Sequence, residues 1–142
     1  MSIWTALLDL LFPPRCPFCG KIQDRSGVCP ICQKNLPLTR EGESVRLLEA
    51  GLRCAAPLWY GDIARQGLLR FKFHEGVSAA DCLGEMIAQC AAEAFYGEFD
   101  LVTWVPVSRK RLRRRGYDQA ELLARAACRV WQAEPKRLLR KN

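Results

Sequence analysis

Two C-x2-C pairs near the start of the chain limit its fold more than any other feature of the sequence. Cys16 and Cys19 form the first pair, Cys29 and Cys32 form the second, and residues 20–28 separate them. A C-x2-C turn presents two sulfurs from one tight knuckle, and two knuckles complete the tetrahedral set of four ligands that zinc prefers. Because four protein ligands leave no open position, we predict a structural zinc rather than a catalytic one.

Free or oxidised thiols and a redox-active pair are the alternatives to zinc at these positions. Both pairs carry a proline after the first cysteine, Pro17 and Pro30, which favours a repeated knuckle over unrelated thiols. A redox C-x-x-C lies near a βαβ pattern in thioredoxin-like proteins, and this sequence has no such pattern. Structural zinc supplies roughly 10–16 kcal/mol of folding free energy in zinc-finger peptides, which suits a segment with few apolar residues. We assign the ribbon and the helix before it to a first unit, residues 1–37.

The N-terminal segment MSIWTALLDLLF is apolar, lacks a positively charged start and is followed at once by Pro13-Pro14. It therefore does not resemble a secretory signal, and it is too short to span a bilayer. We expect a short helix from Ser2 to Phe12, no membrane association and a cytoplasmic location. In a reducing cytosol, paired cysteines bind metal rather than form disulfides.

The other cysteines and the lone histidine lack the spacing of metal ligands. We expect His74 to be a loop residue. Small apolar elements surround the remaining thiols, and a free cysteine behaves there as a small hydrophobic residue. We therefore expect four buried, unreactive thiols: Cys54, Cys82, Cys90 and Cys128.

Residues 38–142 show the pattern of an α/β domain. Residues 38–51 are polar and are expected to be a connector, whereas 54–60 and 100–107 are apolar and predict strands. The order helix, strand, basic loop, helix is the beginning of an α/β arrangement. A single buried strand cannot make a sheet by itself, so the expected sheet is incomplete.

Helical periodicity predicts three helices in the same region. The first begins at an N-cap, Asp62, and ends at Phe71; the others cover 77–95 and 117–132. The positions expected to face inward are Ile63, Gly67, Leu68 and Phe71 in the first helix. In the second helix they are Cys82, Met86, Ile87 and Cys90, and in the third they are Leu122, Leu123, Ala126, Ala127 and Val130.

The positive charge of the chain lies almost entirely in its last third. The net charge is +7: residues 1–100 hold ten Lys/Arg and twelve Asp/Glu (10 − 12 = −2), and residues 101–142 hold twelve and three (12 − 3 = +9). Such clustering indicates an anionic ligand, although a solvated basic turn without a ligand is the alternative. Half of these twelve cations fall in one stretch, Arg109, Lys110, Arg111, Arg113, Arg114 and Arg115.

The chain resembles the front part of the ComF family, which comprises competence-associated, phosphoribosyltransferase-like proteins with an N-terminal zinc ribbon. The resemblance rests on LLFPPRCPFCG, on CPIC followed by NLP, on CAAPLWYGDIARQGLLRFKF, and on VPVSRKRLRRRGYDQAELLARA. It implies a type I phosphoribosyltransferase fold, beginning in residues 38–142. Asp118 stands where the family usually has asparagine.

In that fold, the loop after the first core strand contacts the pyrophosphate of phosphoribosyl pyrophosphate (PRPP), which is used with Mg²⁺. The resemblance carries this role over to Pro106, Val107 and Ser108, with Arg111 and Arg115 nearby. The other basic residues, Arg109, Lys110, Arg113 and Arg114, form a possible nucleic-acid or anion patch.

The family's PRPP signature, a hydrophobic strand followed by two acidic residues and a Thr-Thr-Gly loop, does not occur in the sequence. Its usual place lies beyond residue 142, so the chain is expected to be either truncated or a degenerate member of the family. Truncation is the simpler interpretation, and we expect the chain to be inactive alone and to use PRPP and Mg²⁺ only when complete. The alternative is a non-catalytic module in which the ribbon and the basic loop bind single-stranded DNA or a DNA-processing protein. Nearby aromatic residues, Tyr117 and Trp131, fit single-strand binding.

Overall fold

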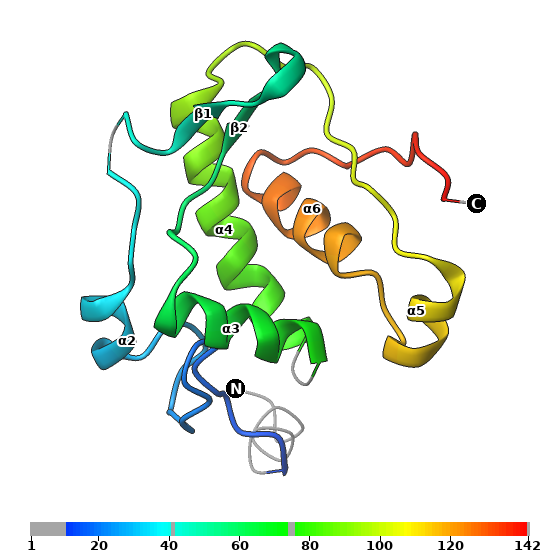
Figure 1. The fold of residues 1–142 in the computed structure, drawn as a ribbon. Helices are drawn as coiled ribbons and strands as arrows, with labels where there is room; N and C mark the ends of the chain where they lie inside the picture. The colour runs from blue at the N-terminus through cyan, green and yellow to red at the C-terminus, as the bar shows by residue number, and fades with distance from the viewer. Residues whose placement is uncertain (1–10, 41, 74–75, 142) are drawn as a thin grey trace.

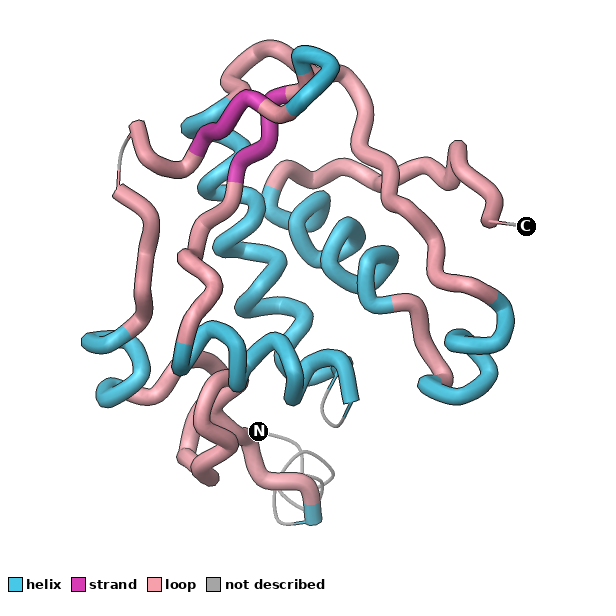
Figure 2. Tube along the Cα trace, viewed as in Figure 1, coloured by secondary structure: helices cyan, strands magenta, loops and turns pink. Residues whose placement is uncertain are grey.

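A computed structural model describes residues 11–40, 42–73 and 76–141 of the chain. Helices and long extended connections dominate these residues, together with one pair of short strands (Figures 1 and 2). In chain order the elements are α2 (Pro30–Asn35), β1 (Val45–Leu47), a 3-10 turn (Glu49–Gly51), β2 (Arg53–Ala55), α3 (Asp62–Phe73), α4 (Gly76–Ala94), α5 (Arg109–Arg115) and α6 (Gln119–Val130). The predicted helix over residues 2–12 and His74 lie largely or wholly outside the described residues.

Helices α4 and α6 form the centre of the molecule and pack side by side (Figure 1). Small residues let them approach closely: a Cβ atom added at Gly84 would lie 2.3 Å from the Cβ of Ala126. Both helices lie close to their predicted bounds, and Ala126 and Ala127 are buried as expected. Val130 was expected to face inward, but it is 50% exposed.

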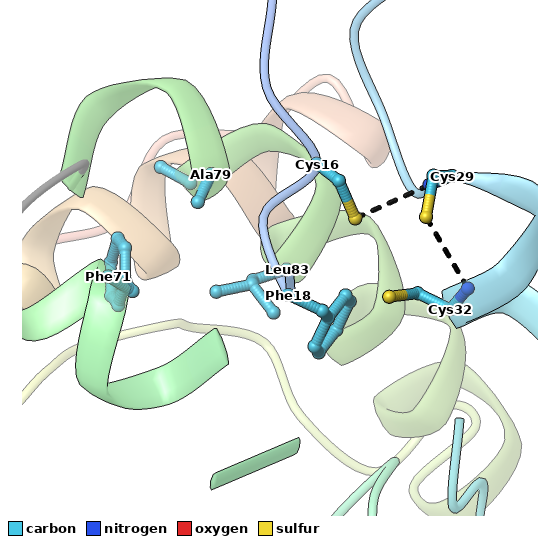
Figure 3. Packing of buried hydrophobic residues seen from close by; sticks show 8 residues of the cluster. Cys16, Phe18, Cys29, Cys32, Phe71, Ala79 and Leu83 are labelled. Carbon is cyan, nitrogen blue, oxygen red and sulfur yellow. Dashed lines mark hydrogen bonds between the residues drawn. The ribbon is translucent and has the colours of Figure 1, made fainter. Parts of the chain in front are cut away.

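The zinc ribbon packs against the first helix that follows it. The side chain of Phe18, which lies between the cysteines of the first knuckle, is completely buried. A Cβ atom at Gly67 of α3 would lie 2.4 Å from the ring of Phe18, so only glycine leaves room for it there. One hydrophobic cluster joins three ribbon cysteines and Phe18 to the helical region (Figure 3): Cys16, Phe18, Cys29, Cys32, Phe71, Ala79, Ala80 and Leu83. The boundary at residue 37 stays a prediction, and apolar packing crosses it.

The predicted strand over residues 100–107 is wrong, although the segment is extended. Its residues alternate as in a strand: Trp104 and Pro106 are buried, whereas Leu101 and Val105 are exposed. A strand exists through hydrogen bonds to a neighbouring strand, and no strand lies beside this segment in the described part of the chain. Its backbone instead accepts one bond from the C-terminal tail, from the Lys136 N–H to the Val102 carbonyl at 2.8 Å.

The small sheet forms where the sequence predicted a connector and one longer strand. β1 lies inside the expected connector and pairs with β2 antiparallel, with Arg46 opposite Cys54. The predicted strand over 54–60 shrinks to β2 and a single bridge between Leu38 and Leu58. Pro57 interrupts the run and donates no hydrogen bond, so regular pairing ends before it. Beyond the ribbon the described chain is therefore mostly helical, with one two-stranded sheet.

Helix α3 begins one residue earlier than its predicted cap implies. Asp62 is the first residue of α3 and has a positive φ of 27°, so it is not an N-cap. The Gly61 carbonyl accepts the first helical bond, from the Arg65 N–H at 3.1 Å. Gly67 and Phe71 are buried as predicted, and the helix continues to Phe73.

A search for membrane-spanning segments in the described helices found none of sufficient length and apolar character.

We expect the chain to self-associate as its concentration rises, because residues 101–107 are extended without a paired strand in the described chain and carry exposed apolar side chains, Leu101 at 42% and Val105 at 70%. Sedimentation velocity should show a sedimentation coefficient that increases with concentration. The substitution Val105→Lys should hold it near the monomer value, whereas Ile31→Lys, on the exposed surface of α2, should not. A natural chain that stays monomeric at every concentration would contradict this prediction.

Candidate functional site

The four predicted zinc ligands lie together at the ribbon end of the molecule. Their Sγ atoms are all within 4.8 Å of one another. Four sulfurs bound tetrahedrally at 2.3 Å from one zinc lie about 3.8 Å apart, so the observed cluster fits the ion after slight contraction. Cys16, Cys29 and Cys32 are buried and Cys19 is partly exposed, which leaves no space for a substrate. The cluster is that of a structural zinc in a ribbon.

Backbone turns place the sulfurs. In the first knuckle, the Gly20 N–H donates to the Cys16 carbonyl and the Cys16 N–H donates to the Lys21 carbonyl, both at 2.9 Å. Gly20 has a φ of 73°, a left-handed conformation that favours glycine. In the second knuckle, Cys29 is the N-cap of α2, and its Sγ accepts the Cys32 N–H at 3.4 Å (Figure 3).

Hydrogen bonds and burial act in opposite directions on the cysteine thiols. Burial disfavours a charged Cys16 thiolate, but backbone N–H groups of Cys19, Cys29 and Phe18 outweigh it and lower the pKa of Cys16 to about 6. Burial raises the pKa of Cys32, and the neighbouring thiols raise it further. Zinc binds cysteines as thiolates, so metal binding at this cluster is coupled to the release of protons.

The cysteines outside the ribbon differ in their exposure. Cys90 and Cys128 are buried as predicted, and burial raises the pKa of each thiol. Cys82 is partly buried, and burial with the nearby Glu85 raises its pKa to about 11. Cys54 was expected to be buried but is exposed, and it lies in β2, a strand of a two-stranded sheet in which Arg53 is exposed as well.

The basic segment is a helix, α5, and the prediction of a loop is wrong. The Ser108 hydroxyl caps its start by accepting the Arg111 N–H at 3.4 Å, and Gly116, with a φ of 81°, ends it by donating to the Leu112 carbonyl at 2.8 Å. Arginine, lysine and leucine are good helix formers. Three like-charged i,i+4 pairs each disfavour α5 by about 0.2–0.5 kcal/mol, and no residue of it is buried. This helix is therefore one that a bound anion would stabilise.

The cations of α5 are mostly free for a ligand. Five of the six are exposed, and no carboxylate of the described chain lies at ion-pair distance from any of them: Arg109, Lys110, Arg111, Arg113 and Arg114. Arg115 differs, because it is partly buried and its guanidinium donates to the Gln119 side-chain oxygen at 2.9 Å. The same guanidinium lies 5.2 Å from the centre of the Phe73 ring on α3.

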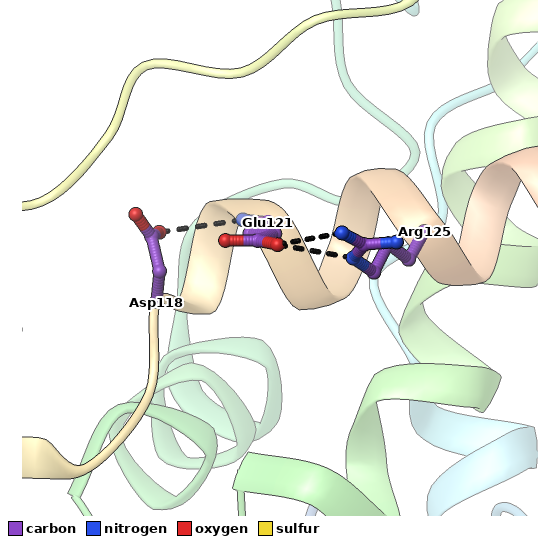
Figure 4. Close-up of polar contacts among 3 residues, drawn as sticks. All are labelled: Asp118, Glu121 and Arg125. Carbon is purple, nitrogen blue, oxygen red and sulfur yellow. Dashed lines mark hydrogen bonds and ion pairs between the residues drawn. The ribbon is translucent and has the colours of Figure 1, made fainter. Parts of the chain in front are cut away.

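Asp118 joins the extended segment to α6. One of its carboxylate oxygens accepts the N–H groups of Ala120 and Glu121, at 3.1 and 3.3 Å, and so caps α6. The other accepts the Val107 N–H at 3.0 Å. One turn further along α6, the Glu121 carboxylate holds the Arg125 guanidinium through two bonds of 3.0 and 2.9 Å (Figure 4).

Two of the five residues assigned to the pyrophosphate loop line a hollow of about 350 Å³ beside α6, namely Pro106 and Val107. Ser108, Arg111 and Arg115 do not line it. Cations from three parts of the chain converge on this hollow: Arg109 from α5, Arg125 from α6, and Arg137, Arg140 and Lys141 from the tail. The tail cations contributed only to the total charge in the sequence, because nothing in their spacing shows that the tail runs back along residues 101–107.

Comparison with known proteins agrees with this geometry. Residues 7–44 match the family model described as the double zinc ribbon domain. The chain is distantly homologous to the competence protein ComFC of Bacillus subtilis (strain 168), with 27% identity over 109 residues. The alignment covers 77% of this chain but only 43% of that protein, so the chain spans less than half the length of this relative. No solved structure matches the chain significantly.

We expect purified protein to contain about one zinc ion per chain, measured by elemental analysis. Cys29→Ser should abolish zinc binding and greatly lower the stability to unfolding, because Cys29 is a ligand, caps α2 and lies in the shared hydrophobic cluster. Cys54→Ser, which alters an exposed cysteine outside the cluster, should keep the full zinc content. Metal-free protein with a folded ribbon would refute the assignment.

Alkylation of the zinc-loaded chain should distinguish the exposed thiol outside the ribbon from the buried ones. We expect iodoacetamide to modify Cys54 first, since it is the exposed cysteine, and Cys90 and Cys128 last, since they are buried with raised pKa values. Removing the metal with a chelator should add the ribbon cysteines to the fast group, as counted by mass spectrometry. Cys54→Ser should remove the first adduct. Equal labelling of the ribbon before and after chelation would contradict a metal-bound cluster.

Proposed function

We propose that the chain is the zinc-stabilised, polyanion-binding part of a ComFC-like protein, and that single-stranded DNA is the ligand of its basic face. The observation that carries this proposal is α5, whose five exposed cations have no acidic partner in the described residues. They are spread along a helix about 10 Å long rather than converging on one point. Such spacing suits the successive phosphates of a strand better than a single small anion.

The relative's name supports a link to competence, and thus to the handling of transforming DNA. In this proposal the zinc ribbon has a structural role, and it positions α3 beside the basic face. A reducing cytoplasm, where the ribbon thiols keep their metal, is the compartment that fits the proposal.

PRPP-dependent phosphoribosyl transfer, with Mg²⁺, is the second candidate and concerns the longer protein. The order of an extended segment, Ser108 and the cation-rich helix α5 supports it, as does the hollow lined by Pro106, Val107 and Arg109. In this candidate, residues 38–142 begin a phosphoribosyltransferase-like domain that further strands complete. The Val107 N–H already donates to the Asp118 carboxylate, so a pyrophosphate at this position would have to displace a negative charge. We therefore rank DNA binding first for this chain.

We expect the chain to bind a fluorescent single-stranded oligonucleotide with a strong dependence on salt. The logarithm of the binding constant should fall with the logarithm of salt concentration by about 0.7 for each phosphate contacted. The triple substitution Lys110→Gln, Arg113→Gln and Arg114→Gln should weaken binding to all sequences alike and flatten this slope by about 2. Fluorescence anisotropy across a salt series measures both quantities.

The matched control removes the same charge from other surfaces. Arg25→Gln, Arg40→Gln and Arg65→Gln alter three exposed arginines outside α5 and should leave the slope nearly unchanged. Binding that ignores salt, or that falls equally in both triple variants, would refute α5 as the contact. Saturable PRPP binding by this chain in calorimetry would favour the second candidate.

A further inference from the structure

An exposed aromatic ring lies beside the basic helix, at the end of α3. Phe73 is the last residue of α3 and is 50% exposed. It lines a hollow of about 440 Å³ together with Lys72, Arg114, Arg115 and Tyr117. Apart from Phe73 and Tyr117, the lining is cationic. The ring of Phe73 is therefore half exposed in a hollow whose other lining is mostly cationic.

The ring is held in this position by contacts between distant parts of the chain. The Tyr117 hydroxyl donates to the Phe71 carbonyl at 2.8 Å, and the Gln119 side-chain amide donates to the Lys72 carbonyl at 3.2 Å. These bonds satisfy two of the last carbonyls of α3 and attach its end to the junction of α5 and α6. The hollow is thus formed before any ligand arrives.

The two cations that contact the Phe73 ring differ in how firmly they are held. Arg115 lies 5.2 Å from the ring centre and is fixed by its bond to Gln119. The Lys72 ammonium lies 5.5 Å from the ring centre, on an exposed and flexible side chain with no carboxylate partner in the described ranges. Lysine can therefore leave the ring and pair with a phosphate, which opens the ring to another planar group.

We propose that Phe73 is a stacking platform for an unpaired nucleobase, with Lys72 and Arg114 binding the phosphates on either side. This inference rests on the proposed function and adds a recognition mode to it. Every base has a flat aromatic face, so stacking is tolerant of sequence. Bases in a duplex are already stacked, and the site selects single strands for that reason.

The test separates stacking from charge by using two probes with equal numbers of phosphates. One is a fifteen-nucleotide oligothymidine, and the other is the same phosphodiester chain with abasic sites. We expect the natural chain to bind the thymidine strand roughly 5- to 150-fold more tightly, the range that stacking on one aromatic residue supplies per base. Phe73→Leu should remove this preference while leaving the affinity for the abasic strand and the salt slope unchanged.

Two further variants complete the comparison. Phe73→Trp should keep the preference for bases, and Tyr96→Leu, which alters a ring that is 87% exposed and outside this hollow, should change nothing. Circular dichroism and thermal unfolding check that each variant is folded. If Phe73→Leu does not fold, 5-iododeoxyuridine strands cross-linked to the natural chain should label Phe73, as mapped by mass spectrometry.

The outcomes distinguish this inference from the function on which it rests. Equal binding of both probes with a steep salt slope would overturn stacking at Phe73 and leave polyanion binding intact. A cross-link confined to another aromatic residue would also overturn it. Failure to bind either probe at low salt would overturn both proposals.

Discussion

Four cysteine sulfurs, gathered where one zinc ion fits, join the ribbon to the hydrophobic cluster that it shares with the helices. The ribbon has little hydrophobic material of its own, and its most buried side chain, Phe18, lies against Gly67 of α3. We therefore expect zinc binding and burial of Phe18 to be coupled. A metal that fixes the first knuckle also fixes Phe18, whose ring packs against α3. The same cluster extends to α4 through Ala79, Ala80 and Leu83.

Local patterns predicted the parts of the structure that depend on local chemistry. The cysteine spacing identified the metal ligands, and periodicity located α3, α4 and α6 within a few residues. Residues 100–107 show the limit of such reasoning, because alternation describes a strand's faces but not whether a partner strand exists. The prediction for the basic segment was wrong for another reason. The run of charged residues suggested a loop, whereas Ser108 and Gly116 are the two caps of a helix. Cys54 is exposed, and the sheet that contains it has only two short strands in the described chain.

The basic face was only partly visible in the sequence. The six cations of α5 stand together in the chain, and their exposure could be anticipated. Phe73 and the tail arginines could not be connected to them. Phe73 lies 36 positions before the start of α5 (109 − 73 = 36), and the tail returns beside the extended segment only in the folded chain (Figure 1). Arg115 also differs from its neighbours for a reason that charge alone does not show: its contacts are with Gln119 and Phe73.

Helix α3 carries both Gly67, which contacts the ring of Phe18 in the ribbon, and Phe73, which lines the hollow beside α5. Six residues of helix separate them by about 9 Å and fix their relative rotation. One residue inserted between them would turn Phe73 by about 100° around the helix axis, away from Tyr117 and Arg115, while the ribbon stayed in place. The number of residues between Gly67 and Phe73 is therefore constrained by both contacts at once. If the ribbon were joined to a helix with a different spacing, the aromatic residue would no longer face the hollow beside α5.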